Sequence, residues 1–407
     1  MAHDFGQKPI TMRILLLTFY YPPDLGAGSF RVKALVEALR AEGGPNLEID
    51  VVTTHPNRYH SHQTKAAELE ESDGLRIRRI GLPAHKSGFR DQAAAFSVFA
   101  RKVAELTKGE HWDLVVATSS RLMTAALGAH IASRINAPLY LDIRDLFTDT
   151  MSDLLSRRLG WAILPAFRWL ESRTFRSAQT INIVSKGFLP HVQKIAPKGQ
   201  FRTYTNGIDD EFLTESFAKG AGKSDELPLV VYAGNMGEGQ GLHHLIPQAA
   251  RLLQGKARLR LIGDGGKREE LAKAVSQAGV TNVEMLTAVP RLELYAHYRE
   301  ADILCMHLND HAAFHKVLPS KLFEYGATGK PIIAGVAGYP AEFLNAELSG
   351  VAVFPPCDPK GMANAVEQLL ANPDVGDRRA FCERFSRTII MREMARDILG
   401  TGQASTT

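Results

Sequence analysis

The chain contains little cysteine and no long apolar segment. Its 407 residues include three cysteines, Cys305, Cys357 and Cys382, which lie far apart and form no Cys-x-x-Cys pair. Neither a disulfide framework nor a cysteine-based zinc site is encoded, and the expected compartment is a reducing cytosol. Apolar runs such as 227–233 stop far below the roughly 18–20 residues that span a bilayer. The polar residues 1–9 lack the apolar core of a signal peptide, so we expect no export.

Three sequence patterns are also missing. The chain has no Asp-x-Asp motif and no histidine-rich ligand spacing, so we expect no obligatory metal ion and no cofactor. The turn after its first apolar strand is not the Gly-x-Gly-x-x-Gly dinucleotide fingerprint, which disfavours a dehydrogenase.

Positive charge is in slight excess and is unevenly distributed. Lys and Arg number 48 against 44 Asp and Glu, and the first 200 residues hold 26 basic and 19 acidic residues. A basic first half suggests an anionic partner such as a phosphate group or a lipid surface, and it fits a merely solvated surplus equally well. We expect no nucleic-acid partner.

Short apolar runs alternate with amphipathic segments, which is typical of parallel sheets covered by helices on both faces. The expected strands are 13–19, 48–53, 75–80, 114–117, 138–143, 180–184, 201–205, 229–233, 259–263, 283–286, 303–306, 331–335 and 351–354. We therefore predict an α/β protein with two doubly wound, Rossmann-like domains, 1–218 and 219–376, and a crossover helix and tail, 377–407, that returns to the first domain. The two sheets are expected to face each other across a ligand-binding cleft.

Each predicted domain begins with a strand, a glycine-containing loop and a helix. The first loop contains Gly26 and Gly28, and the second contains Gly234, Asn235 and Gln240 among four glycines in eight residues. Such loops let a phosphate approach backbone amides at a helix N-terminus. The alternative is a tight turn without a ligand.

The segment 319–331 predicts a helix capped by Ser320 and followed by a buried strand. Lys321 in the first turn opposes the helix dipole, which suits a phosphate contact better than it suits stability. Glu324 lies one turn later, where a carboxylate can accept both hydroxyls of a ribose. An exposed Lys-Glu pair is the alternative.

Several motifs together resemble the family 4 retaining glycosyltransferases of GT-B fold, over nearly the whole chain. They are the Tyr-Pro-rich first turn, residues 141–147, residues 205–209, the loop 234–242 and the segment 319–325. Segments 56–60 and 85–89 are similar to the branch that builds bacterial O-antigen, lipopolysaccharide and capsule, in particular the N-acetyl-L-fucosamine transferases. The resemblance implies transfer of N-acetyl-L-fucosamine or a related amino-deoxy sugar from a UDP-sugar to a lipid-linked saccharide.

The resemblance also assigns donor-binding residues. Glu324 is expected to bind the ribose, and the base pocket is expected at Gly263, Asp264 and Val289. Two departures concern charge. Lys316 replaces the first carboxylate of the family's paired Glu motif, and Asn235 and Gln240 stand where many relatives carry an Arg and a Lys. We expect Lys316 and Lys321 to supply the missing positive charge to the diphosphate.

Catalysis in such an enzyme requires cations at the departing diphosphate and a carboxylate near the oxocarbenium-like sugar. We predict Asp142, Asp145 and Lys321 as catalytic residues, with Asp142 in the place of the family's first-domain His. The alternative is that Asp142 and Asp145 form ion pairs with Arg144 or another cation.

The acceptor implied by the resemblance is an undecaprenyl-diphosphate-linked sugar at the inner face of the cell membrane. Basic residues are available for it at Lys86 and Arg90, and at Arg157 and Arg158 within a basic, tryptophan-containing stretch, 154–176. Such a stretch suits peripheral contact with an anionic membrane. An ordinary amphipathic helix explains it equally well.

Two other functions remain open at this point. A nucleotide-sugar 2-epimerase has the same fold and donor site but needs no acceptor. A non-catalytic binding protein for sugar nucleotides is suggested by Lys316 in place of a carboxylate.

Overall fold

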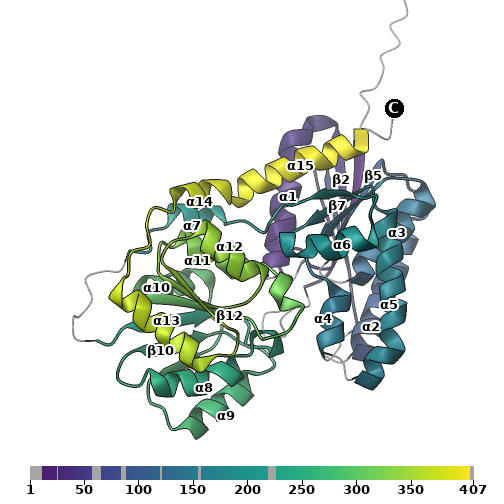
Figure 1. The fold of residues 1–407 in the computed structure, drawn as a ribbon. Coiled ribbons are helices and arrows are strands. Elements are labelled where there is room, and N and C mark those ends of the chain that lie inside the picture. Colours follow the sequence, from purple (N-terminus) through teal and green to yellow (C-terminus); the bar gives the residue numbers. More distant parts are fainter. Residues whose placement is uncertain are drawn as a thin grey trace, which may run out of the picture. The chain divides into compact units, whose positions relative to one another are not determined.

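The computed structural model describes residues 12–24, 26–56, 66–83, 89–119, 122–154, 157–218 and 226–403 (Figure 1). Contacts within the chain divide it into two units. The first is Met1–Asn206 with Arg387–Thr407, and the second is Gly207–Ser386. Among the described residues, no helix combines the length and the apolar character that crossing a membrane requires.

The first unit is built on an eight-stranded sheet of order β3-β4-β2-β1-β5-β6-β7-β8. Its strands are β1 (Met12–Leu17), β2 (Leu47–Thr54), β3 (Leu69–Ser72), β4 (Leu75–Ile80), β5 (Leu114–Ser119), β6 (Leu139–Ile143), β7 (Thr180–Ile183) and β8 (Gln200–Arg202). Every described pair of neighbours is parallel except β3 with β4. The central strands are almost continuously apolar because helices cover both of their faces.

Helices of the first unit connect these strands, and one returns from the end of the chain. They are α1 (Ala27–Gly43), α2 (Phe89–Leu106), α3 (Leu122–Ile135), α4 (Phe147–Leu154), α5 (Arg157–Ser177), α6 (Leu189–Ile195) and α15 (Arg387–Gln403). Helix α15 packs along α1 (Figure 1), which confirms the predicted return of the C-terminal helix to the first domain.

The second unit is built on a six-stranded, fully parallel sheet of order β11-β10-β9-β12-β13-β14. Its strands are β9 (Leu229–Ala233), β10 (Arg258–Ile262), β11 (Val283–Leu286), β12 (Ile303–His307), β13 (Ile332–Gly335) and β14 (Val351–Phe354). Its helices are α7 (Asp210–Thr214), α8 (Leu242–Leu252), α9 (Arg268–Ala278), α10 (Arg291–Glu300), α11 (Ser320–Ala327), α12 (Tyr339–Glu347), α13 (Pro359–Ala371) and α14 (Arg379–Arg384).

The structure differs from the sequence-based boundaries at both junctions. Residues 207–218 belong to the second unit, because the rings of Phe212 and Phe217 pack against Tyr295. The helix expected from 377 onward is two helices, α14 and α15. Between them, Phe385 O accepts a hydrogen bond of 2.7 Å from the amide of Ile208, which ends the first helix inside the second unit.

Candidate functional site

Hydrogen bonds from its own polar side chains hold the glycine-rich loop after β9 together. Asn235 Nδ2 donates to Gln240 Oε1 at 2.7 Å, and the amide of Gly237 donates to the same oxygen at 3.2 Å. The short 3-10 helix η3 (Glu238–Gln240) lies within this loop. Asn235 and Gln240, the expected phosphate contacts, therefore bind each other in the structure and shape the loop without adding charge.

The loop after β10 packs directly on this glycine-rich loop. The amide of Met236 donates to Asp264 O at 2.8 Å, and Asp264 Oδ1 accepts from the amide of Gly265 at 2.8 Å. Gly263 has φ +146°, and a Cβ placed on it would lie 1.9 Å from Gly234 O. Gly234, Gly263 and Asp264 are thus brought together at the carboxyl edge of the sheet.

We expect Gly263→Ala to lower the free energy of unfolding by about 1–3 kcal/mol, since an alanine is strained at this φ and meets backbone rather than a movable side chain. Gly266→Ala is the matched control in the same loop, because a Cβ there meets nothing within 4 Å. Urea unfolding measured for both variants checks this expectation. Equal stability of the two variants would show that the close packing of the loops is not required.

Helix α11 carries the predicted donor pair. Lys321 Nζ lies 3.1 Å from Glu324 Oε2 and donates to Tyr298 Oη at 3.2 Å. A Cβ on Gly234 would lie 3.7 Å from Lys321 Cε, so the lysine stem lies against the glycine-rich loop. Burial disfavours the charged form of Lys321, but the Glu324 carboxylate outweighs burial and raises the lysine pKa. Lys321 is therefore a protonated, partly buried cation beside this loop.

Ser320 was expected to cap α11, and that prediction is wrong. The helix begins at Ser320, and the N-cap is Pro319, which accepts no hydrogen bond through its side chain. Because proline has no polar side chain, the first-turn amides of α11 are without a side-chain cap. An anion-binding role for this end of the helix is consistent with that arrangement.

Two buried aromatic residues that the sequence analysis missed hold these segments in place. Tyr325 Oη lies 3.2 Å from the amide of Ala233 and 3.3 Å from its carbonyl oxygen, which ties α11 to the end of β9. His307, at the end of β12, accepts from the amide of Cys357 at its Nε2, so its Nδ1 carries the proton that is shared with Gln240 O. Burial lowers the pKa of His307 to about 4, so the ring is neutral and acts as a fixed link to the loop.

The remaining donor-site candidates lie on neighbouring segments of the second unit. Lys316 ends the 3-10 helix η4 (Phe314–Lys316), just before α11. A Cβ on Gly239 would lie 2.9 Å from the Phe314 ring, so η4 packs against the glycine-rich loop. Val289 is half-buried between β11 and α10.

In the first unit, Gly28 of the first loop accommodates an arginine. Gly26 is the N-cap residue of α1, and a Cβ on Gly28 would lie 2.2 Å from Arg144 Nη1. Asp145 follows Arg144, and its Oδ1 accepts from Thr150 Oγ1 at 3.3 Å. Burial raises the pKa of the Asp145 carboxyl. The Arg144 guanidinium therefore lies near the N-terminus of α1, and the Asp145 carboxyl next to it in the sequence is bound to Thr150.

Asp142 is a structural carboxylate, and this corrects its predicted catalytic role. Its side chain is 0% exposed, and its two oxygens accept from Arg31 Nε at 3.0 Å and Arg31 Nη2 at 2.9 Å. Asn182 Nδ2 donates to it at 2.7 Å. Burial opposes ionisation of Asp142, but Arg31 outweighs it and lowers the carboxyl pKa. The alternative of an ion pair is therefore correct, with Arg31 as the cation.

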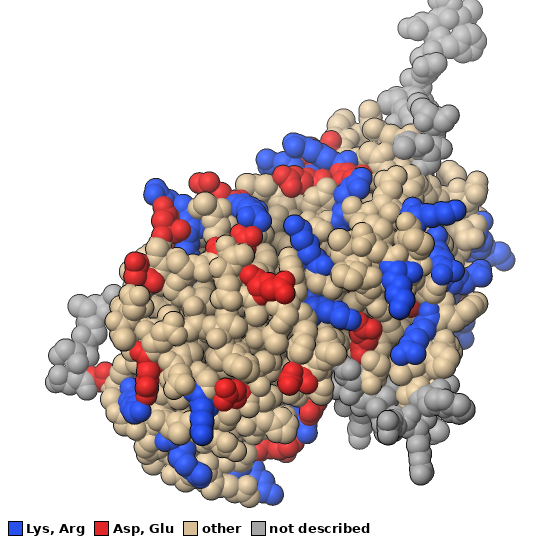
Figure 2. All heavy atoms as spheres, viewed as in Figure 1, with Lys and Arg blue, Asp and Glu red and all other residues tan. Residues whose placement is uncertain are grey.

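The predicted acceptor residues lie largely outside the described part of the chain. This holds for Lys86 and for the side chains of Arg90, Arg157 and Arg158. The C-terminal half of α5 is described, and its exposed side chains include Arg168, Trp169, Arg173 and Arg176. The Arg173 guanidinium lies 5.8 Å from the centre of the Trp169 ring. Figure 2 shows Lys and Arg side chains gathered over the helices of the first unit on this face.

Two family models match the chain, one in each unit. The model described as "Glycosyl transferase 4-like domain" matches residues 26–203, and the model described as "Glycosyl transferases group 1" matches residues 214–388. The chain is a glycosyltransferase. The family 4 type and the two Rossmann-like domains of the GT-B fold are as the sequence predicts.

Two related proteins match the glycosyltransferase over most of its length. Uncharacterized glycosyltransferase MJ1607 of Methanocaldococcus jannaschii is 24% identical over 381 residues, which cover 89% of this chain and 90% of that protein. A GDP-mannose-dependent alpha-mannosyltransferase of Mycobacterium tuberculosis is 24% identical over 345 residues, which cover 84% of this chain and 83% of that protein.

Solved structures share the fold of the glycosyltransferase at low sequence identity. Anabaena Alr3699/HepE, in complex with UDP and glucose, superposes with a TM-score of 0.67 at 15% identity, covering 96% of this chain and 99% of that one. The lipopolysaccharide outer core galactosyltransferase WaaB, in its apo form, superposes with a TM-score of 0.63 at 12% identity, covering 97% of this chain and 100% of that one.

Proposed function

We propose that the glycosyltransferase moves a sugar from a UDP-sugar to a lipid-linked saccharide, with retention at the anomeric carbon, in the synthesis of bacterial O-antigen or capsule. The observation that carries this proposal is the Lys321 and Glu324 pair on α11, next to the glycine-rich loop. A cation beside loop amides suits a diphosphate, and a neighbouring carboxylate suits a ribose. The sugar we propose is N-acetyl-L-fucosamine or a related amino-deoxy sugar.

The proposed chemistry follows from where charge develops during transfer. The departing diphosphate gains negative charge, and Lys321 with the loop amides stabilises it without an obligatory metal ion. Lys316 adds charge from the adjacent η4 segment. On the sugar side, Asp145 is a better candidate than Asp142 for a carboxyl group that contacts the reacting sugar. The reason is that the Asp142 carboxylate is buried in an ion pair with Arg31.

The proposed acceptor is an undecaprenyl-diphosphate-linked sugar, bound by the first unit at the inner face of the cell membrane. The support is the exposed Trp169 among the arginines of α5. An indole beside guanidinium groups suits the interface of an anionic membrane. WaaB, which shares the fold, is described as a lipopolysaccharide outer core galactosyltransferase.

A thermal-shift screen against UDP, GDP and dTDP tests the donor proposal, because a ligand of the folded state raises the melting temperature. We expect a selective shift with UDP, the nucleotide that is bound in the HepE complex. A selective shift with GDP would overturn the uridine assignment and favour the donor of the mycobacterial relative. Conversion of the UDP-sugar into its 2-epimer without any acceptor would instead favour the 2-epimerase, and binding without turnover of any donor would favour the non-catalytic protein.

The proposed ribose contact predicts the behaviour of Glu324→Ala. We expect about 10- to 100-fold weaker UDP binding, because hydrogen bonds to a charged group are lost. The wild-type protein is expected to prefer UDP over 2′-deoxy-UDP, and the variant should have lost most of this preference. Isothermal calorimetry with both nucleotides measures the effect. An undiminished preference in the variant would exclude Glu324 as the ribose ligand.

A further inference from the structure

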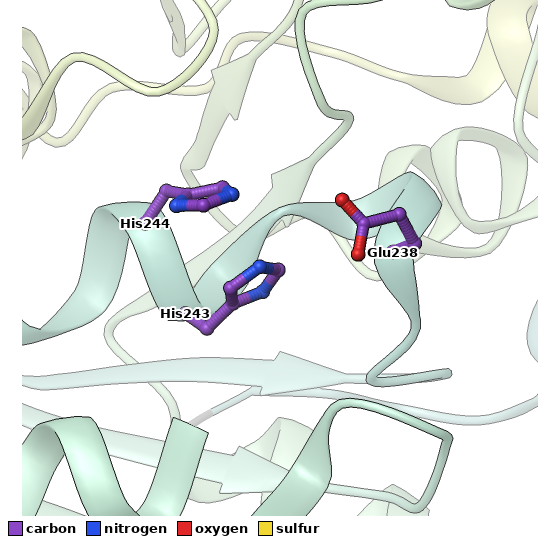
Figure 3. Close-up of side chains that lie close together, drawn as sticks. All are labelled: Glu238, His243 and His244. Atoms are coloured by element: carbon purple, nitrogen blue, oxygen red, sulfur yellow. The ribbon is translucent and has the colours of Figure 1, made fainter. Parts of the chain in front are cut away.

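Three side chains that could bind a metal ion converge at the start of α8. Glu238 comes from η3, and His243 and His244 come from the first turn of the helix. Each offers one ligand atom, and these atoms lie within 4.8 Å of one another (Figure 3). Two imidazoles with a carboxylate form a ligand set that suits Zn²⁺ and similar transition metals.

The backbone between these residues is held in one conformation. Gly241 has φ +57°, and this left-handed residue turns the chain from η3 into α8. A Cβ on Gly241 would lie 2.9 Å from Asn309 Cγ, and Asn309 Nδ2 donates to Glu238 O at 2.9 Å. Packing therefore fixes the backbone of Glu238 relative to the first turn of α8.

His243 has a ring nitrogen that is available to an ion. Its side chain is 4% exposed, and its buried Nδ1 has no hydrogen-bond partner among the described residues. His244 is exposed, which gives an ion a route from solvent.

One cation competes for the same carboxylates. Lys267 Nζ lies 3.2 Å from Glu238 Oε2 and 2.6 Å from Glu270 Oε2. The side chain of Lys267 is one-third exposed, so it can turn into solvent when an ion arrives. Glu270 Oε1 lies 3.9 Å from His243 Nε2, close enough to orient the ring or complete the ligand set. The carboxylate of Glu270 also offsets the repulsion between a bound cation and the positive, N-terminal end of the α8 dipole.

We propose that Glu238, His243 and His244 bind a divalent transition metal ion of the Zn²⁺ class. Binding replaces Lys267 at the Glu238 carboxylate and joins η3 to the first turn of α8. The site is an accessory one, and it goes beyond the proposed sugar transfer, in which the side chains of these residues have no assigned part.

Calorimetric titration of the untagged full-length chain with Zn²⁺, in the absence of nucleotide, tests the site. We expect one ion per chain, and at least about tenfold weaker binding in His244→Gln and in Glu238→Gln. Lys267→Gln is expected to bind Zn²⁺ more tightly, because the competing ammonium is gone. His130→Gln, which replaces an exposed histidine on α3, is the matched control and should bind as the wild type does.

A second readout reports geometry rather than affinity. Co²⁺ bound by nitrogen and oxygen ligands at low coordination number gives visible absorption bands, which should appear in the wild type and in His130→Gln and be absent in His244→Gln. His244 is exposed, so its replacement leaves the core intact. No Zn²⁺ binding at micromolar concentration, or unchanged binding in His244→Gln, would overturn the proposal. Because nucleotide is absent throughout, neither result depends on the donor assignment.

Discussion

Replacing Asp142 by alanine is expected to lower the free energy of unfolding of the first unit by about 3–5 kcal/mol. Asp142 and Arg31 are both fully buried, and two guanidinium nitrogens donate to the carboxylate. Removing the carboxylate leaves the guanidinium in the core without its counter-ion. A catalytic aspartate would behave differently, because its removal would abolish turnover with little effect on unfolding.

Tryptophan fluorescence during urea unfolding measures the loss of stability in the first unit, which contains Asp142. The chain has three tryptophans, Trp112, Trp161 and Trp169, and all of them lie in the first unit. Glu37→Ala is the matched control on the same helix as Arg31, because Glu37 is exposed and its pair with Lys33 is on the surface. Its stability should change by no more than about 0.5 kcal/mol. If Asp142→Ala unfolds as the wild type does but has lost turnover, the catalytic interpretation is restored.

Lys321→Ala is expected to lower kcat by about 10²- to 10³-fold, the usual effect of removing a charged donor from a developing anion. Uridine affinity should change little, whereas UDP affinity should fall, because the lysine is proposed to contact phosphate and not the nucleoside. The raised pKa of Lys321 means that the cation is present throughout the neutral pH range.

Lys273→Ala provides the comparison for this variant, since Lys273 is an exposed lysine of the second unit on α9. It should leave kcat and both affinities at their wild-type values. Kinetics with the UDP-sugar and calorimetry with uridine and UDP separate the effects. Equal losses of uridine and UDP affinity in Lys321→Ala would show that the lysine acts by holding Glu324, not by contacting phosphate.

Local periodicity was sufficient to predict most of the fold. The expected strands coincide with observed ones within a few residues because strands buried on both faces are continuous apolar runs. Strand β3 was missed because its sequence, Leu-Glu-Glu-Ser, is fully exposed and carries no apolar signal. The segment expected as a strand to residue 205 ends at Arg202, and beyond it the carbonyls of Tyr204 and Thr205 accept from Arg31.

Side-chain contacts could be predicted where they follow from local spacing, and they were missed where they depend on distant partners. Lys321 and Glu324 are three residues apart on one helix, so their contact can be predicted from the sequence. Asp142 was misassigned because its partner Arg31 lies 111 residues away. The metal-ligand cluster has no conventional spacing, since the left-handed turn at Gly241 brings Glu238 to His243 and His244.

The return of α15 affects the order in which the protein can fold on the ribosome. Its residues Met394 and Ile398 are fully buried in the first unit, and Asp397 accepts from Tyr140 Oη at 3.1 Å and Arg202 Nε at 2.8 Å. The second unit is therefore an insertion within the first one. Although domains generally fold from the N-terminus during synthesis, here the first unit lacks part of its core until α15 emerges. The inserted unit has its complete sequence earlier, so the part that begins first is the one that is completed last.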